Sequence, residues 1–174
     1  MANPTHRFTG KVVVVTGAGG GIGTAIATRF ASEGARVVVT DVNEAGALAT
    51  TSAITAAGDD ATAIAADISD KGACKELIAD VVSRFGGIDV LVNNAGVNRR
   101  GPLLDLTDED WEMTMRVNVD SMFHLCRAAI PHMIEAGGGA IVNTASQWGL
   151  YPAPGHIAYN VSKAAVAAFT QNLA

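Results

Sequence analysis

The sequence is poor in cysteine and in charged residues, and no hydrophobic run is long enough to span a bilayer. Charged residues make up only 17% of the chain against 49% hydrophobic residues, which excludes a disordered protein. Its two cysteines, Cys74 and Cys126, are not spaced as metal ligands, and we expect reduced, buried thiols. Residues 1–10 lack the apolar core of a signal peptide. We therefore predict a soluble, cytoplasmic protein with no metal site and no membrane partner.

Basic clusters are also missing. The net charge is -5, and Arg99-Arg100 is the longest run of basic residues, so a nucleic-acid partner is not expected. What the chain does contain is glycine, with 19 residues that indicate tight turns or close backbone approaches. A length of 174 residues is enough for one domain with a real core and too short for two ordinary ones. We predict a single domain over residues 1–174.

Short runs of β-branched residues alternate along the chain with longer stretches of helical character. Such runs, apolar throughout, are typical of strands that are buried on both faces of a sheet. The expected strands cover residues 11–16, 35–41, 61–66, 88–93 and 140–145. The expected helices cover residues 21–33, 43–57, 69–85, 107–136 and 159–173. This alternation predicts an α/β fold: a doubly wound (Rossmann) parallel sheet with helices on both faces, truncated after the fifth strand and its following helix.

Punctuating residues set several of these boundaries. Gly34 and Gly58 are expected to end the first two helices, and Ser69 is expected to cap the third. Thr107 opens a capping-box-like start to the fourth helical region. Pro131 lies within that region, where we expect a lost hydrogen bond or a kink.

A glycine-rich segment joins the first expected strand to the first helix. Backbone N–H groups and the positive end of a helix form an anion site there, and glycine lets a pyrophosphate approach closely. Ile22 breaks the G-x-G-x-x-G pattern. The segment fits T-G-x-x-x-G-x-G through Gly17, Gly21 and Gly23, and it also fits T-G-x-x-G-x-x-G through Gly20. This segment alone does not decide between the two patterns.

An acidic residue ends the second expected strand. Asp41 follows Gly17 at the distance where a carboxylate accepts hydrogen bonds from the adenosine ribose hydroxyls of a dinucleotide. The same charge would repel the 2′-phosphate of NADP. Gly20 and Val42 occupy positions where a lysine or arginine often receives that phosphate. We therefore predict NAD as the cofactor in preference to NADP.

A tyrosine and a lysine stand four residues apart near the end of the chain. Tyr159 and Lys163 share one face of an expected helix, although such a pair is weak evidence by itself. Ser146 precedes them at the end of the fifth expected strand, and Asn118 lies in the fourth helical region. Asn93-Asn94-Ala95-Gly96 follows the fourth strand.

Taken together, these motifs resemble the short-chain dehydrogenase/reductase family. The glycine pattern, N-N-A-G, the serine and Y-x-x-x-K occur in the family's order, and N-N-A-G favours its compact, ordinary branch. The resemblance covers essentially the whole chain but implies that the C-terminal third of the family's domain is absent. Its implied cofactor-binding residues are Gly17, Gly20, Gly21, Ile22, Gly23, Asp41, Asp67, Ile68, Asn94, Ala95, Gly96, Tyr159 and Lys163.

The resemblance implies hydride transfer between NAD(H) and a secondary alcohol or ketone. Tyr159 would be the general acid/base, and the ammonium of Lys163 would favour its phenolate and bind the nicotinamide ribose. Ser146 would orient the substrate oxygen, Asn118 would hold a relay water, and Asp67-Ile68 would contact the adenine.

Two alternatives remain open from the sequence. One is a catalytically inactive NAD-binding fragment, favoured by the absent C-terminal third. The other is an epimerase or dehydratase of the extended branch, favoured only by the second glycine pattern. We also expect a homo-oligomer, a dimer or tetramer, because the last helix is apolar nearly all round.

The substrate is expected to be a small molecule. Trp148 and Tyr151 predict a moderately apolar substrate pocket, while His156, a loop histidine with no partner in view, is interpreted as structural or solvated.

Overall fold

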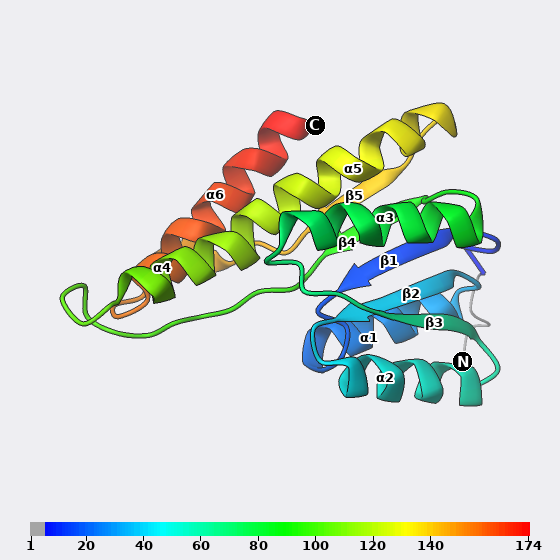
Figure 1. Ribbon diagram of the computed structural model, residues 1–174, viewed down its shortest axis with the longest axis horizontal. Coiled ribbons are helices and arrows are strands. Elements are labelled where there is room, and N and C mark those ends of the chain that lie inside the picture. Colours follow the sequence, from blue (N-terminus) through cyan, green and yellow to red (C-terminus); the bar gives the residue numbers. More distant parts are fainter. Residues whose placement is uncertain (1–5) are drawn as a thin grey trace.

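A five-stranded parallel sheet carries helices on both faces, in a computed structural model that describes residues 6–174 (Figure 1). Residues 1–5, which belong to the expected domain 1–174 and to the segment expected to lack a signal peptide, lie outside the described residues. The strand order is β3-β2-β1-β4-β5, with every neighbouring pair parallel. The strands are β1 (Val12–Thr16), β2 (Arg36–Asp41), β3 (Asp60–Ala65), β4 (Val90–Asn93) and β5 (Ala140–Asn143). The expected doubly wound α/β fold is confirmed.

Six α-helices and two short irregular turns connect or follow the strands within residues 6–174. The helices are α1 (Gly21–Ser32), α2 (Glu44–Ala56), α3 (Lys71–Phe85), α4 (Asp108–Met115), α5 (Ser121–Glu135) and α6 (Ile157–Leu173). The turns are a π turn, η1 (Arg116–Asp120), and a 3-10 turn, η2 (Gln147–Gly149).

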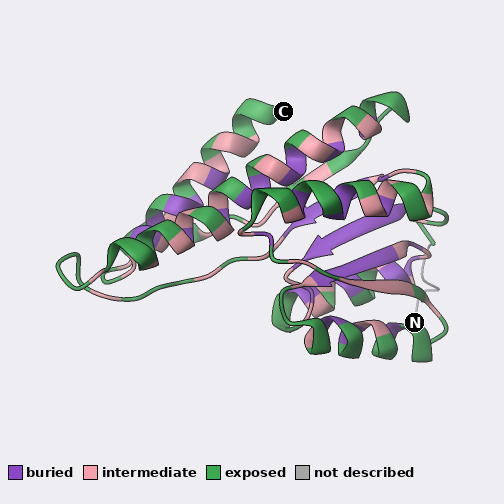
Figure 2. Ribbon diagram, in the orientation of Figure 1, coloured by how far each residue is buried: buried purple, intermediate pink, exposed green. Residues whose placement is uncertain are grey.

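Successive valines of β1 point to opposite faces of the sheet and enter two separate cores. Val12 and Val14 pack with the apolar faces of α3 and α5. Val13 and Val15 pack with alanines of α1 and α2 and with Ile54 of α2, and Ile26 and Phe30 of α1 pack against the same core. Burial on both faces explains why this strand reads as an unbroken apolar run (Figure 2).

The helix boundaries differ from expectation at two points. Asp70, not Ser69, caps α3, and its Oδ1 accepts from Ala73 N at 2.7 Å. Ser69 N instead donates to Asp67 Oδ1 at 3.0 Å in the preceding turn, so Ser69 belongs to the loop. Helix α6 begins at Ile157, two residues before Tyr159, without a side-chain cap that the sequence could have signalled.

The fourth helical region is divided by a wider turn. Thr107 caps α4 as expected, with Oγ1 accepting from Asp110 N at 3.1 Å. The irregularity then falls at η1, while α5 continues through Pro131. Pro131 thus lies inside α5, where a proline has no N–H to donate. The π turn, with its one extra residue, precedes α5 at residues 116–120.

Both cysteine side chains are buried, free thiols. Burial raises the pKa of the Cys74 thiol and of the Cys126 thiol to about 11. Neither is therefore a thiolate near neutral pH, which is the form that attacks substrates or binds metals.

Candidate active site

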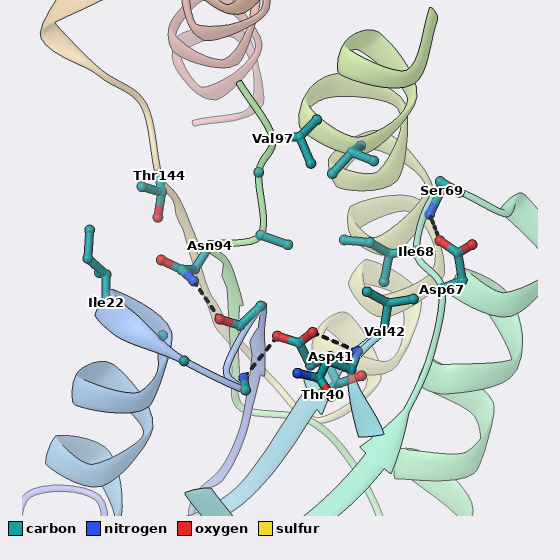
Figure 3. A pocket seen from close by; sticks show the side chains of 18 of the residues that line it. Ile22, Thr40, Asp41, Val42, Asp67, Ile68, Ser69, Asn94, Val97 and Thr144 are labelled. Carbon is teal, nitrogen blue, oxygen red and sulfur yellow. Dashed lines mark hydrogen bonds between the residues drawn. The ribbon is translucent and has the colours of Figure 1, made fainter. Parts of the chain in front are cut away.

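A cavity of about 790 Å³ opens at the carboxyl ends of the strands, between the first helix and the last (Figure 3). This is the edge where ligands bind in open parallel sheets, and the volume falls in the usual range of about 300–1,000 Å³ for cofactor sites. Within residues 6–174, no group of three His, Cys, Asp or Glu side chains is placed to hold a metal ion. The same residues include no helix with the length and apolar character needed to cross a membrane.

The glycine loop, residues 17–23, forms one wall of the cavity. Gly17 has a φ of +62°, and a Cβ there would lie 2.7 Å from Ala95 Cα. A Cβ on Gly23 would lie 2.0 Å from Gly17 O, so both positions require glycine. A Cβ on Gly20 or on Gly21 would meet no atom within 4 Å, and Gly20 lines the cavity whereas Gly21 does not. Gly17 and Gly23 thus allow close packing of the backbone, as Gly19 does against the Asp41 side chain, whereas Gly20 and Gly21 leave space around the loop.

The N-terminus of α1 faces this space without an acidic residue or a side-chain cap of its own. Gly20, its N-cap, supplies no side-chain hydrogen bond, and the first turn contains no acidic residue. Ile22 lines the cavity there with 69% of its surface exposed. Unpartnered N–H groups and a positive helix end are the donor set that a pyrophosphate requires, so the residues present fit a dinucleotide.

Asp41 lies between the glycine loop and the end of β2. Its Oδ2 accepts from Gly19 N at 2.9 Å, and its Oδ1 accepts from Asn43 N at 2.9 Å (Figure 3). The half-buried carboxylate therefore fixes the loop against β2 while it also lines the cavity. A carboxylate can accept about four hydrogen bonds, so acceptor capacity remains for a ligand hydroxyl.

The segments after β3 and β4 complete this half of the cavity. Asp67 is exposed and Ile68 is buried, and both line the cavity. Asn94 Nδ2 donates to Thr16 O at 3.0 Å and to Gly17 O at 3.3 Å, so β4 is tied to the glycine loop. Ala95 and Gly96 line the cavity beside it. Asn93, one residue earlier, ties β4 to β5 by donating to Asn143 Oδ1 at 2.8 Å.

Tyr159 and Lys163 line the other half of the same cavity. Lys163 is 3% exposed, and its Nζ donates to Thr144 O at 2.7 Å. The Nζ atom lies 5.6 Å from the centre of the Tyr159 ring. Burial lowers the pKa of Lys163 because desolvation disfavours the ammonium form. An ammonium has three donors, so two remain for a ligand.

Asn118 lies behind this pair, in η1, and does not itself line the cavity. Its Oδ1 accepts from Val97 N at 2.8 Å, and its Nδ2 donates to Val97 O and Ser162 Oγ, both at 2.9 Å. A Cβ on Gly96 would lie 3.2 Å from Asn118 Oδ1 and 3.4 Å from Lys163 Nζ. Asn118 and Lys163 therefore border the same small space beside Gly96.

Ser146 is half-buried and is not among the residues that line the cavity. Its Oγ accepts from Trp148 N at 3.2 Å and caps η2. The hydroxyl proton takes no part in that bond, so the group can still donate to a ligand.

Sequence reasoning missed several residues that line the cavity. Val42, Val97 and Thr144 each follow the end of a strand, and that position is a signal that could have found them. Met113 and Val117, from α4 and η1, carry no such signal. Trp148 and Tyr151 are not among the residues that line this cavity, and Tyr151 is 78% exposed. Their expected role in a substrate pocket stays a prediction.

Comparison with known proteins gives one consistent family. The sequence profile of the family described as short chain dehydrogenase matches residues 11–174. D-threitol dehydrogenase of Mycolicibacterium smegmatis is 40% identical over 168 residues, which are 97% of this chain and 65% of the relative. The chain thus spans about two thirds of the length of that relative.

Solved structures agree with the sequence comparison. A structure of NAD⁺-bound xylitol dehydrogenase has a TM-score of 0.93 at 37% identity and covers 97% of this chain, which covers 65% of it. A metagenomic short-chain oxidoreductase in complex with NADP has a TM-score of 0.93 at 39% identity. The match covers 96% of this chain and 76% of that structure's chain. The family profile matches nearly the whole chain, and the chain has relatives in this family by sequence and by structure. The chain therefore belongs to the short-chain dehydrogenase family.

Proposed function

We propose that this chain is an NAD-dependent oxidoreductase that transfers a hydride between NAD(H) and a secondary alcohol or ketone. The observation that carries the proposal is that Tyr159 and Lys163 line the same cavity as the glycine loop. An anion site at the glycine loop and a proton-transfer pair at Tyr159 and Lys163 would then act on one bound dinucleotide.

The residues described above would hold the cofactor from end to end. The N–H groups at the start of α1 would bind the pyrophosphate. Gly20 and Gly21 leave space for it, while Gly17 and Gly23 let the loop pack closely against its neighbours, and Ile22 lines the cavity beside them. Asp67 and Ile68 would contact the adenine, and Asn94, Ala95 and Gly96 would border the middle of the molecule. Lys163 would donate to the nicotinamide ribose. When bound, the nicotinamide supplies the hydride acceptor or donor, and the chain supplies binding, orientation and proton transfer.

Asp41 supports NAD over NADP. Its carboxylate would accept from the ribose hydroxyls and repel a 2′-phosphate. The related structures include one with NAD⁺ and one with NADP, so the family alone gives no preference. Val42, next to Asp41, offers no positive charge to a phosphate, which again favours NAD.

Tyr159 would take the alcohol proton during oxidation and return it during reduction. A phenol is a poor base near neutrality, and the positive charge of Lys163, 5.6 Å from the ring centre, favours the phenolate. The free hydroxyl proton of Ser146 would hydrogen-bond the substrate oxygen and orient it toward Tyr159. Asn118 Oδ1, which retains acceptor capacity, would hold a water beside Gly96 and Lys163, giving the proton a route outward.

A chain that binds the dinucleotide without turning over a substrate is the second candidate, retained from the sequence. These 174 residues cover about two thirds of the length of the relatives, so the activity of the chain by itself is a matter for the assay below. An extended-branch epimerase or dehydratase rests only on the alternative glycine spacing.

The full 174-residue chain can be assayed for NADH and NADPH formation over a panel of secondary alcohols, sugars and hydroxy acids. We expect NAD-linked turnover, and we expect Tyr159→Phe to lower it by about 10²–10⁴-fold while leaving NADH binding intact. Normal turnover by Y159F would overturn the role of the phenol. NADH binding without turnover on any substrate would favour the second candidate.

A further inference from the structure

Two loops meet beside Tyr159, which lines the cavity. They are the β4 loop, residues 94–107, and the β5 loop, residues 144–156, which run toward the same end of the molecule (Figure 1). Gly101 N donates to Gly155 O at 3.0 Å, and Gly101 forms an isolated parallel bridge with His156. The two loops are therefore joined through their backbones at one point.

His156 adds a side-chain link between the same loops. Its Nδ1 lies 3.0 Å from Asn98 Oδ1, and Asn98 lines the cavity. A carbonyl oxygen can only accept, so the imidazole carries its proton on Nδ1 and donates it. On its other side the imidazole packs against Trp148, with ring centres 4.6 Å apart. The histidine thus contacts one residue from each loop.

Trp148 in turn contacts the Tyr159 ring. Their ring centres lie 6.0 Å apart, with an angle of 84° between the planes, which is an edge-to-face arrangement. Trp148 belongs to a three-residue 3-10 turn, and Tyr159 lies in the first turn of α6, which has no side-chain cap. The Tyr159 ring therefore has Trp148 as an aromatic neighbour, and Lys163 Nζ lies 5.6 Å from its centre.

We propose that His156 is a positioning residue for Tyr159: bound to Asn98 and packed against Trp148, it holds the phenol in the direction needed for proton transfer. This inference rests on the proposed function, because it assigns the chain Asn98–His156–Trp148 to the orientation of that reaction's acid/base. Small displacements of a reacting group matter, since a shift of about 1 Å can lower a rate by about 10²-fold.

The test is steady-state kinetics of the full chain with paired variants. His156→Ala removes both contacts, and we expect kcat to fall by about 10- to 100-fold while KM for NAD changes by less than about threefold. His156→Phe keeps a ring against Trp148 but loses the donor. Asn98→Leu removes the acceptor at similar volume, whereas Asn98→Asp keeps one.

The expected pattern is a larger loss of kcat in N98L than in N98D, and no further loss when N98L is combined with H156F. Equal losses in N98L and N98D, or independent losses that multiply in the double variant, would overturn the link. Melting temperatures are measured alongside, and a kcat loss that merely follows a lowered melting temperature would also overturn it.

Failure of this inference can be told apart from failure of the proposed function. A wild-type chain that binds NADH but turns over no substrate contradicts the proposed function, and the positioning role with it. Wild-type turnover that H156A leaves unchanged contradicts the positioning role alone.

Discussion

The two halves of the cavity are built by different means. Around the glycine loop, the geometry depends on the absence of side chains, because a Cβ at Gly17 or Gly23 would collide with backbone atoms. Around Tyr159 and Lys163, it is set by side-chain hydrogen bonds from Lys163 to Thr144 and from Asn118 to Val97 and Ser162. One half therefore depends on close packing of the backbone, and the other on a polar network that must be complete.

This contrast predicts where substitutions should act. Adding atoms to the glycine half should damage folding and cofactor binding together. Removing atoms from the tyrosine–lysine half should damage turnover while leaving the dinucleotide site in place. The variants that follow separate these outcomes.

Lys163→Met should have the largest effect. Methionine fills a similar volume but removes the charge that favours the phenolate, and loss of one preorganised electrostatic partner lowers kcat by about 10²–10³-fold. The measurement is kcat at saturating NAD, so that weaker binding does not contribute. Lys75→Met makes the same chemical change on an exposed position of α3 and should leave kcat unchanged. A similar loss in both variants would refute the assignment.

Gly23→Ala should damage the other half. The added Cβ would lie 2.0 Å from Gly17 O, and relief of such overpacking costs about 1–3 kcal/mol of unfolding free energy. Thermal unfolding and NADH titration should both show the loss. Gly20→Ala is the control, since φ is -176° there and a Cβ meets no atom within 4 Å. Its melting temperature should match the wild type, and equal destabilisation by the two alanines would show that close packing does not define this half.

Asp41→Asn should have an intermediate effect on cofactor choice. The amide keeps an acceptor oxygen but loses the charge that repels a 2′-phosphate, so we expect the ratio of kcat/KM for NAD over NADP to fall by about tenfold. Asp67→Asn removes one charge from the same cavity at an exposed position and should change the ratio less. An unchanged ratio in D41N would remove the basis for predicting NAD.

Glu33 lies outside both halves of the cavity. Glu33→Gln should therefore lower the stability of the fold without changing turnover, by an amount that depends on pH. Hydrogen bonds from Arg7 and from Arg29 lower the pKa of the buried Glu33 from 4.5 to about 2, against the opposing effect of burial. Because the pKa is lower in the folded state, the stabilisation is fully present above pH 4.5 and is lost as the pH falls toward 2.

Urea unfolding midpoints at pH 7, 4.5 and 3 would measure this. The advantage of the wild type over E33Q should shrink as the solution is acidified. Asp80→Asn, which breaks an exposed ion pair with Arg84, is the control and should show a smaller difference. An advantage that grows in acid would contradict the assignment.

The fold was predictable from the sequence because the strong signals are local. The valine runs of β1 and β2 and the glycines that end the helices predicted the sheet and most boundaries, and the structure confirms them. The predicted cap of α3 was wrong because Ser69 and Asp70 both suit a helix N-terminus. The hydrogen bond from Ser69 N to Asp67 Oδ1 holds Ser69 in the preceding turn and leaves Asp70 as the cap.

The candidate site could be predicted only in part from the sequence. Residues that follow strand ends or belong to motifs, such as Gly17, Asp41, Tyr159 and Lys163, line one cavity. Met113 and Val117 reach it from α4 and η1, whose path depends on tertiary packing that the sequence does not display. The roles of the catalytic residues, the preference for NAD and the homo-oligomer stay predictions.

The alternation of valines along β1 has a consequence for how the site is located. Shifting this strand by a single residue would exchange the side chains offered to the two cores, so helices on both sides oppose a slip. Thr16, the last residue of β1, pairs with Thr40, and the glycine loop starts immediately after it. Apolar packing on both faces of the sheet therefore fixes the position of the glycine loop relative to the neighbouring strands, independently of any ligand.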